Sequence, residues 1–357
     1  MKTPIRVLVI DDSALMRKLI PQILERDDSI QVIGTAMDGT FGLKKIEELQ
    51  PQVVTLDLEM PGMNGIDTLK EIMRKSRVPV IVVSSHSTEG ASITLKALAL
   101  GAFDFVAKPQ DVSSRMPEIA AELIGKIKAG AQSKGTRVAP LPDESARTSK
   151  VRLNPKTTPS RVVAIGVSTG GPNALQYVLS QLPADFPGTI LVVQHMPDGF
   201  TDMFARRLDE VCSIQVKHAQ SGDLLCAGRA LICPGNRHIK VKRLPLGDVA
   251  VLSDEPRVNG HRPSADVLFR SVAEEFGSNT LAVLMTGMGD DGAEGMGAVK
   301  AAGGMTVAQN EESCVVFGMP KAAIDRGYAL RVVALETMAS TLQAQCGHDK
   351  AAGAGKG

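Results

Sequence analysis

The stretch IRVLVIDDS, residues 5–13, decides the fold of the first part of this chain. Its first six residues are mainly apolar and β-branched, and two aspartates and a serine follow them directly. A short apolar run of this composition is typical of a buried strand. Residues 14–24 then carry apolar side chains at helical spacing, so this part of the chain is a predicted strand–loop–helix unit.

The same alternation continues to residue 129. Strands are predicted for the apolar runs at residues 5–10, 31–36, 53–56, 80–83 and 104–107. Helices are predicted where apolar residues have helical spacing, at residues 14–24, 41–48, 65–74, 89–100 and 113–129. Strands that alternate with helices in this way form a parallel sheet covered on both faces. We therefore expect an α/β fold in which residues 1–129 form a doubly wound, flavodoxin-like domain.

A second domain is predicted further along the chain. Residues 130–160 lose the pattern and are rich in Gly, Ser, Thr, Pro and charged residues, which predicts a flexible linker. The α/β alternation resumes over residues 161–345, with β-rich runs at 161–166, 189–194 and 280–285. Within this domain, residues 214–252 contain short strands between Gly and Pro turns, which predicts an antiparallel excursion from a mostly parallel sheet. Residues 346–357 are predicted to be a disordered tail.

The composition excludes several classes of function. The 357 residues have a net charge of +1, only 3% are aromatic and none is Trp, which disfavours nucleic acid as the main partner. The five cysteines form an odd set without a CxxC pair, so reduced thiols are more plausible than disulfides or a zinc site. The apolar runs are too short to span a bilayer, and the N-terminus does not resemble a signal peptide. We expect a soluble cytoplasmic protein without membrane insertion.

Acidic residues follow two of the predicted strands in the first domain. Asp11 and Asp12 follow the first strand, and Asp57 follows the third. The carboxyl ends of neighbouring parallel strands meet at one edge of the sheet, so these three carboxylates are expected to converge there. Such a cluster needs a hard cation to offset its repulsion, and Mg²⁺ prefers oxygen ligands.

Two further side chains are expected at this edge. Ser84 ends the fourth strand and Lys108 follows the fifth. The set suits an aspartyl phosphate, with Asp57 as the nucleophile and with Mg²⁺ and Lys108 balancing the charge of the phosphoryl group. Taken singly, each residue also fits an ordinary solvated turn or surface position, so the prediction depends on their joint placement.

The second domain carries a candidate nucleophile in RVVAIGVSTGGP, residues 161–172. The small residues around Ser168 allow a sharp turn after the strand, and this turn either presents the hydroxyl or cradles a phosphate. His195 follows the next β-rich run, and Asp290 and Asp291 follow a third. Parallel strands would bring all of them to one edge, where a serine, a histidine and a carboxylate form a proton relay.

The spacing leaves alternatives open at this second site. His238 and His261 are rival bases, and a pair of aspartates in a Gly-rich turn also fits simple turn chemistry. The Gly-rich turns offer backbone N–H groups for an oxyanion.

The first domain resembles the receiver domains of response regulators. The resemblance is carried by the Asp-Asp-Ser sequence at 11–13, LDLEMPGMNG at 56–65 and the Lys-Pro pair at 108–109. It implies phosphotransfer from a histidine kinase to Asp57, with the backbone carbonyl of Glu59 as a further Mg²⁺ ligand. Ser84 stands where many receivers have Thr, which keeps the hydroxyl.

The second domain resembles the chemotaxis protein-glutamate methylesterases. Six segments carry the resemblance: GVSTGG (166–171), QHMP (194–197), PGNRH (234–238), NGHRPSADVLF (259–269), TGMGDDGAEGM (286–296) and AQNEESCVVFGMP (308–320). It implies that Ser168 is the nucleophile, His195 the base and Asp291 the carboxylate. Backbone donors near Thr169 and Met288 would then bind the oxyanion.

Together the two resemblances imply a phosphorylation-activated serine hydrolase. It would demethylate glutamate methyl esters and deamidate glutamines on chemoreceptors, and ester hydrolysis itself would need no cofactor. We also expect the unphosphorylated receiver to inhibit the enzyme by docking over the Ser168 face. The alternative is a response regulator whose output domain binds DNA or a nucleotide without catalysis. Against it, residues 161–345 show no helix-turn-helix signature, and the segment GVSTGG (166–171) lacks the G-x-G-x-x-G fingerprint and the P-loop lysine.

Overall fold

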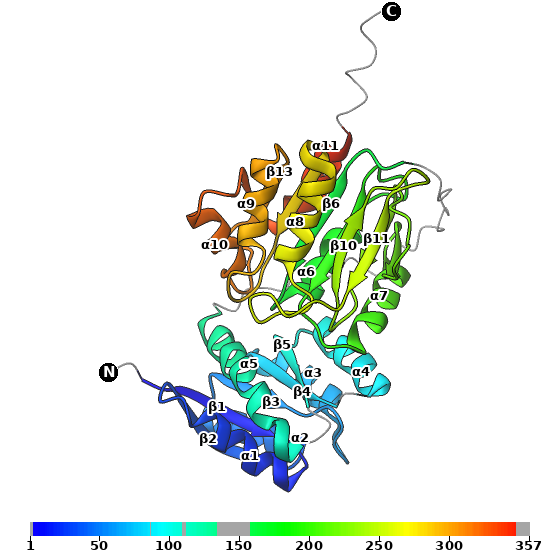
Figure 1. The fold of residues 1–357 in the computed structure, drawn as a ribbon. Helices are drawn as coiled ribbons and strands as arrows, with labels where there is room; N and C mark the ends of the chain where they lie inside the picture. The colour runs from blue at the N-terminus through cyan, green and yellow to red at the C-terminus, as the bar shows by residue number, and fades with distance from the viewer. Residues whose placement is uncertain (1–2, 86, 109–111, 134–157, 348–357) are drawn as a thin grey trace, which may run out of the picture. The chain divides into compact units, whose positions relative to one another are not determined.

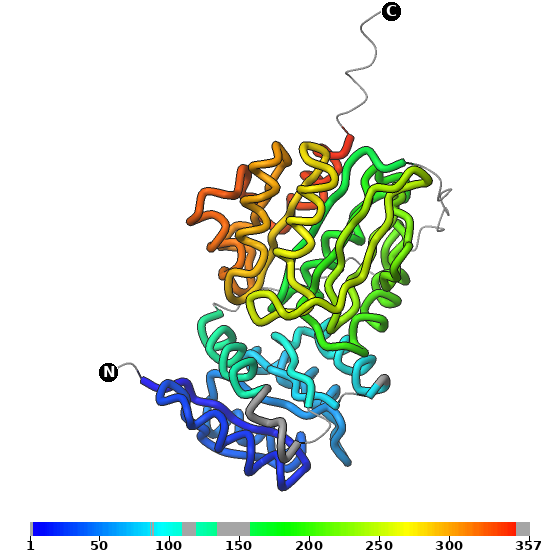
Figure 2. The backbone as a smooth tube through the Cα atoms, in the orientation of Figure 1, coloured from blue at the N-terminus to red at the C-terminus, as the bar shows by residue number. Residues whose placement is uncertain are grey.

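The computed structural model describes residues 3–85, 87–108, 112–133 and 158–347. The chain divides into two compact units, Met1–Val138 and Ala139–Gly357. Each unit is built from one continuous stretch of chain, as the colours of the backbone trace in Figure 2 show. Helix α5 ends at Gln132, so the first residues of the predicted linker are helical. Residues 134–157 of that linker and residues 348–357 of the predicted tail lie outside the described residues.

The first unit has a five-stranded parallel sheet in the order β2-β1-β3-β4-β5 (Figure 1). The expected doubly wound α/β fold is thus confirmed. One face of the sheet packs apolar residues, such as Val7 and Val9 of β1, against α1 and α5. On the other face, Ile10 packs against α2. The elements are β1 (Ile5–Ile10), α1 (Ala14–Leu24), β2 (Ile30–Ala36), α2 (Gly39–Leu49), β3 (Val53–Leu56), α3 (Gly65–Lys75), β4 (Val80–Ser84), α4 (Thr88–Ala99), β5 (Asp104–Ala107) and α5 (Val112–Gln132).

The second unit has a seven-stranded sheet in the order β14-β13-β12-β6-β7-β9-β8, and all its strands are parallel. Strands β10 and β11 form a separate antiparallel pair. The elements are β6 (Val162–Val167), α6 (Gly171–Leu179), β7 (Thr189–Gln194), α7 (Phe200–Val211), β8 (Gln215–His218), β9 (Arg229–Ile232), β10 (His238–Lys242), β11 (Val249–Ser253), α8 (Ala265–Phe276), η1 (Gly277–Asn279), β12 (Thr280–Leu284), α9 (Ala293–Ala301), β13 (Met305–Gln309), α10 (Met319–Asp325), β14 (Arg331–Val333) and α11 (Leu335–Gly347).

The antiparallel excursion is shorter than its predicted span of 214–252. Only β10 and β11 are antiparallel, whereas β8 and β9 continue the main sheet in parallel. Ala230, Leu231 and Ile232 in β9 are fully buried, as expected for a parallel strand covered on both faces. The hairpin packs on the main sheet together with α8 and α9, and these elements share one apolar core (Figure 1). No helix within the described residues is both long and apolar enough to cross a membrane.

Candidate active site

Ser168 lies directly after β6, at the centre of the seven-stranded sheet. Its backbone N–H donates to the carbonyl of Thr286, which lies beyond β12, over 3.0 Å. Its own carbonyl accepts from the N–H of Gly171 at 2.8 Å, which closes the turn into α6. Gly287 packs so tightly here that a Cβ on it would lie 2.8 Å from the Cβ of Ser168. The small residues therefore let two loops meet at the candidate nucleophile.

His195 lies directly after β7, the strand next to β6. Val167 and Gln194 are paired residues of these two parallel strands, so the candidate nucleophile and base follow matched positions. Neighbouring strands lie about 4.8 Å apart, so the two backbones are close. The side-chain amide of Gln194 donates to the carbonyls of both Ser168 and His195 at 3.1 Å and ties the two turns together.

Asp291 lies in the loop between β12 and α9 and reaches the imidazole of His195. Its Oδ2 lies 2.8 Å from Nε2 of His195. The carboxylate is buried and also accepts hydrogen bonds from the start of α8, namely from the Ser264 hydroxyl at 2.6 Å and the Ala265 N–H at 2.7 Å. A helix N-terminus favours a negative charge at this position. Asp291 is therefore held between the imidazole and α8.

The pKa of Asp291 shows how well its charge is compensated. Burial alone raises the pKa of this carboxyl. The hydrogen bond and charge of His195, together with the hydrogen bonds from Ser264 and Ala265, outweigh burial and lower the pKa to about 2. Asp291 is consequently ionised at neutral pH and is able to orient the imidazole and to stabilise it when protonated.

The second ring nitrogen of His195 is available for proton transfer. Among the described residues, its Nδ1 has no hydrogen-bond partner although it is buried, so the Ser168 hydroxyl is not bonded to it in this structure. Hydrogen bonds between catalytic groups often form only when substrate is present. The structure thus brings His195 and Asp291 into contact and places Ser168 beside them, one strand away.

The rival acid–base candidates occupy different environments. His238 is fully buried and uses both ring nitrogens, because Nδ1 accepts from the Ser264 N–H at 3.2 Å and Nε2 donates to the Pro256 carbonyl at 3.0 Å. His261 stacks on the ring of His195. Asp290 is exposed and forms an ion pair with Arg326 at 2.7 Å, away from the imidazole. These contacts favour His195 and Asp291 over their neighbours.

The two predicted oxyanion donors lie in the adjoining loops. Thr169 is buried, and its carbonyl accepts from the Thr286 hydroxyl at 3.0 Å. Met288 is 39% exposed in the loop before Asp291. Their N–H groups remain predicted oxyanion donors. Sequence reasoning missed Ser264 and Gln194 as supports of the site, although both belong to quoted motifs.

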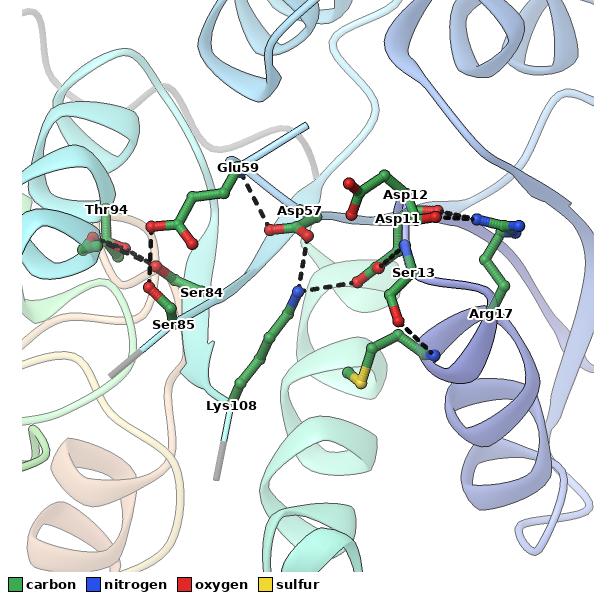
Figure 3. A network of polar contacts seen from close by, with 12 residues as sticks. Asp11, Asp12, Ser13, Arg17, Asp57, Glu59, Ser84, Ser85, Thr94 and Lys108 are labelled. Carbon is green, nitrogen blue, oxygen red and sulfur yellow. Dashed lines mark hydrogen bonds and ion pairs between the residues drawn. The ribbon is translucent and has the colours of Figure 1, made fainter. Parts of the chain in front are cut away.

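The first unit gathers its acidic residues at the carboxyl edge, where the strand order reverses between β1 and β3 (Figure 3). Carboxylate oxygens of Asp11, Asp12 and Asp57 lie within 4.8 Å of one another. The ammonium of Lys108 lies 2.7 Å from Asp57 and 3.1 Å from Asp11. Two of the three carboxylates in this cluster thus pair with the ammonium of Lys108.

The electrostatics of this cluster suit a cation. Burial raises the pKa of both Asp11 and Asp57, although the ammonium of Lys108 acts in the opposite direction. The surplus negative charge and the all-oxygen donor set fit Mg²⁺. Asp11, Asp12 and Asp57 are the side chains that would hold it.

Of the other predicted members of the phosphoryl site, the Ser84 hydroxyl is bonded to residues of α4, and the Glu59 side chain has a partner of its own. The Ser84 hydroxyl accepts from Thr94 at 2.6 Å and donates to the Gly90 carbonyl at 3.2 Å, so it faces α4 (Figure 3). The Glu59 side chain accepts from Ser85 at 2.9 Å, while its backbone N–H donates to Asp57 at 3.2 Å. The roles predicted for the Ser84 hydroxyl and the Glu59 carbonyl stay predictions.

Comparison with known proteins defines the class of each unit. Residues 7–119 match the response regulator receiver domain family, and residues 163–342 match the CheB methylesterase family. The crystal structure of the Thermotoga maritima CheB methylesterase catalytic domain is similar, with 40% identity and a TM-score of 0.51, and the match covers 52% of this chain and 98% of that one. The two units are therefore a receiver domain and a methylesterase domain.

Full-length relatives share both units. A protein-glutamate methylesterase/protein-glutamine glutaminase 2 of Koribacter versatilis is 63% identical, with 96% of each chain covered. A protein-glutamate methylesterase/protein-glutamine glutaminase of Symbiobacterium thermophilum is 45% identical over 95% of this chain and 96% of that protein. The present chain belongs to the CheB methylesterase family, as its sequence motifs predict.

Proposed function

We propose that this chain is a phosphorylation-activated serine hydrolase that demethylates glutamate methyl esters and deamidates glutamines on chemoreceptors. The names of its relatives support the two reactions. The observation that carries the proposal is the 2.8 Å contact between His195 and the buried Asp291, next to Ser168 and with the other ring nitrogen of His195 unoccupied. The substrates are membrane receptors, and a histidine kinase of the same pathway is the phosphoryl donor.

The reaction divides into acylation and deacylation. Nδ1 of His195 accepts the proton of the Ser168 hydroxyl as Oγ attacks the ester carbon of the glutamyl side chain. The protonated imidazole then gives this proton to the leaving methoxide, which departs as methanol and leaves an acyl-enzyme. Water, deprotonated by His195, releases glutamate and restores Ser168. With glutamine as substrate, the leaving group departs as ammonia.

Asp291 and the loops support these steps without exchanging protons. Asp291 stays ionised and stabilises the imidazolium that forms twice in each cycle. The N–H groups of Thr169 and Met288 would bind the oxyanion, and one such donor typically lowers the barrier by about 2.7–4 kcal/mol.

The first test measures methanol release from membranes that carry methyl-labelled chemoreceptors. Ser168→Ala should lower turnover by at least about 10³-fold and abolish labelling by a fluorophosphonate serine probe. Undiminished activity of this variant would refute the assigned nucleophile. A wild-type protein that neither reacts with the probe nor releases methanol would favour the alternative, an output domain that binds without catalysis.

Regulation is proposed to start at Asp57. Its carboxylate attacks the phosphorus of the kinase's phosphohistidine, so that an O–P bond forms while the N–P bond breaks and the histidine leaves. Lys108 then bonds the transferred group through an ammonium already placed 2.7 Å from Asp57. Bound Mg²⁺ would neutralise charge on the phosphoryl oxygens. Phosphorylation adds about −1.5 to −2 charge and shifts the receiver between two states, one of which inhibits the esterase.

A deletion tests the inhibitory role of the receiver. The similar Thermotoga maritima structure consists of the catalytic domain alone, so a chain lacking residues 1–150 is a reasonable subject. It should hydrolyse receptor methyl esters faster than the unphosphorylated full chain. If its rate is equal or lower while its fold is intact, the receiver is not an inhibitor.

A further inference from the structure

The ring of His195 lies flat against a second imidazole. His261, in the segment between β11 and α8, stacks on His195 with ring centroids 3.9 Å apart and planes only 3° from parallel. At this separation the two rings are in van der Waals contact. His195 cannot tilt toward His261 without a clash, and turning away would sacrifice the contact.

The turn that carries His261 has a defined shape. Val258 and His261 exchange two backbone hydrogen bonds, of 3.0 and 2.9 Å, around Asn259 and Gly260. Both central residues have positive φ, 52° and 78°, which is the type I′ turn that the Asn-Gly sequence favours. A two-residue turn closed in this way leaves the backbone of His261 little freedom.

This turn is also fastened to the helix that holds Asp291. The side-chain amide of Asn259 donates to Asp266 at 2.8 Å, and the other carboxylate oxygen of Asp266 accepts from the Gly295 N–H at 2.6 Å. Asp266 lies in the first turn of α8, next to the Ser264 and Ala265 groups that bind Asp291. One rigid assembly therefore holds both the carboxylate and the stacked ring.

We propose that His261 is a positioning residue that acts through His195. Its ring blocks tilting of the His195 imidazole, and the bond from Nε2 to Asp291 blocks rotation within the ring plane. Together the two contacts fix the position of Nδ1 at the carboxyl edge of the sheet, where Ser168 also lies. The inference rests on the proposed function, because it takes His195 to be the base of that reaction. It assigns no chemistry to His261 beyond orienting this base. Misplacement of a reacting group by about 1 Å can cost about 10²-fold in rate.

Two substitutions of His261 distinguish an effect of ring planarity from an effect of side-chain volume. His261→Phe keeps a planar ring and should retain turnover within about threefold. His261→Leu keeps comparable volume without a flat face, and should lower kcat about tenfold with little change in KM. Both are assayed in the full-length protein, by methanol release from membranes with methyl-labelled chemoreceptors, and a thermal melt within a few degrees of wild type would show that the fold persists.

The outcomes distinguish this inference from the proposed function. If the wild type turns over substrate and His195→Ala is inactive, His195 is established as the base independently of His261. Given that result, wild-type kcat in His261→Leu overturns the positioning role. An equal loss in the Phe and Leu variants also overturns it, because ring nitrogens rather than planarity would then matter. A loss in Leu that appears only in KM assigns His261 to substrate binding and rejects the inference.

Discussion

The two units differ in how the charge of their buried aspartates is compensated, although these aspartates lie at the same edge of similar sheets. Both collect their polar side chains at the carboxyl edge of a parallel sheet covered by helices. In the first unit, the carboxylates of Asp11, Asp12 and Asp57 lie close together, and the ammonium of Lys108 pairs with Asp11 and Asp57. In the second, Asp291 is surrounded by the imidazole of His195 and donors from α8.

The two key aspartates therefore have pKa values displaced in opposite directions. Burial raises the pKa of Asp57. For Asp291, burial is outweighed by its hydrogen-bond donors, and the pKa falls to about 2. An undercompensated carboxylate suits a group that binds a cation and accepts a phosphoryl group, whereas a fully compensated one suits an immobile support. The fold sets where a side chain lies, and its neighbours set what it does.

The largest expected effect separates the two adjacent aspartates of the second unit. Asp291→Asn should lower kcat by about 10³- to 10⁴-fold, because an amide neither supports the imidazolium nor enforces the reactive tautomer. Asp290→Asn is the matched control, since Asp290 is exposed and paired with Arg326. Methanol release from both variants checks this, and equal losses would mean that the acidic pair acts only through the turn it forms.

A smaller effect is expected for the serine that bonds Asp291. Ser264→Ala should lower the free energy of unfolding by about 1.5–3 kcal/mol, as for a hydrogen bond to a charged group, and reduce kcat about tenfold. Ser271 is a matched buried serine on α8 whose hydroxyl bonds the backbone N–H and carbonyl of Val241. Ser271→Ala should cost stability but leave kcat unchanged. Denaturant unfolding and kcat are measured on both, and a retained kcat in Ser264→Ala would contradict its supporting role.

The depressed pKa of Asp291 predicts a stability change with pH. Its carboxylate stabilises the folded state fully above the reference pKa of 3.8, and this contribution is lost as pH falls toward about 2. The linked stabilisation is about 2 kcal/mol. The difference in unfolding free energy between wild type and Asp291→Asn should therefore shrink between pH 4 and 2. A difference that stays constant across this window would show that the charge of Asp291 is not what stabilises the fold.

Replacing aspartate by asparagine in the receiver, at Asp57, should change the free energy of unfolding in the opposite direction. Asp57 has a raised pKa, so its ionised form disfavours the folded state at neutral pH, and the protein gains stability as pH falls. Asp57→Asn should raise the free energy of unfolding at pH 7, because it removes a buried surplus charge while Lys108 keeps its ion pair with Asp11. It should also weaken the increase in melting temperature caused by Mg²⁺ and remove activation by a phosphoryl donor. Destabilisation by Asp57→Asn would contradict the charge surplus described for this cluster.

Much of the architecture could be predicted from local patterns. Apolar runs and helical spacing locate the strands and helices of the first unit to within three residues, with β1 and α1 matched at both ends and α5 differing most at its C-terminal end. The two family resemblances, and with them the class of enzyme, follow from short motifs such as the one around Ser168. Within residues 214–252, local patterns predicted the antiparallel pair β10–β11 but missed that β8 and β9 are parallel, because strand direction depends on which neighbour a strand pairs with and not on its own composition.

Relations between distant residues required the tertiary structure. The sequence left three histidines as possible bases, and only packing shows that His238 has both nitrogens engaged while His195 meets Asp291, 96 residues away. The stack of His261 on His195 is equally invisible in the motifs that contain them. Motifs identify chemistry because residue type is local information. Contacts are decided by strand order and loop closure over long separations, which is why the arrangement around the base emerged only with the fold.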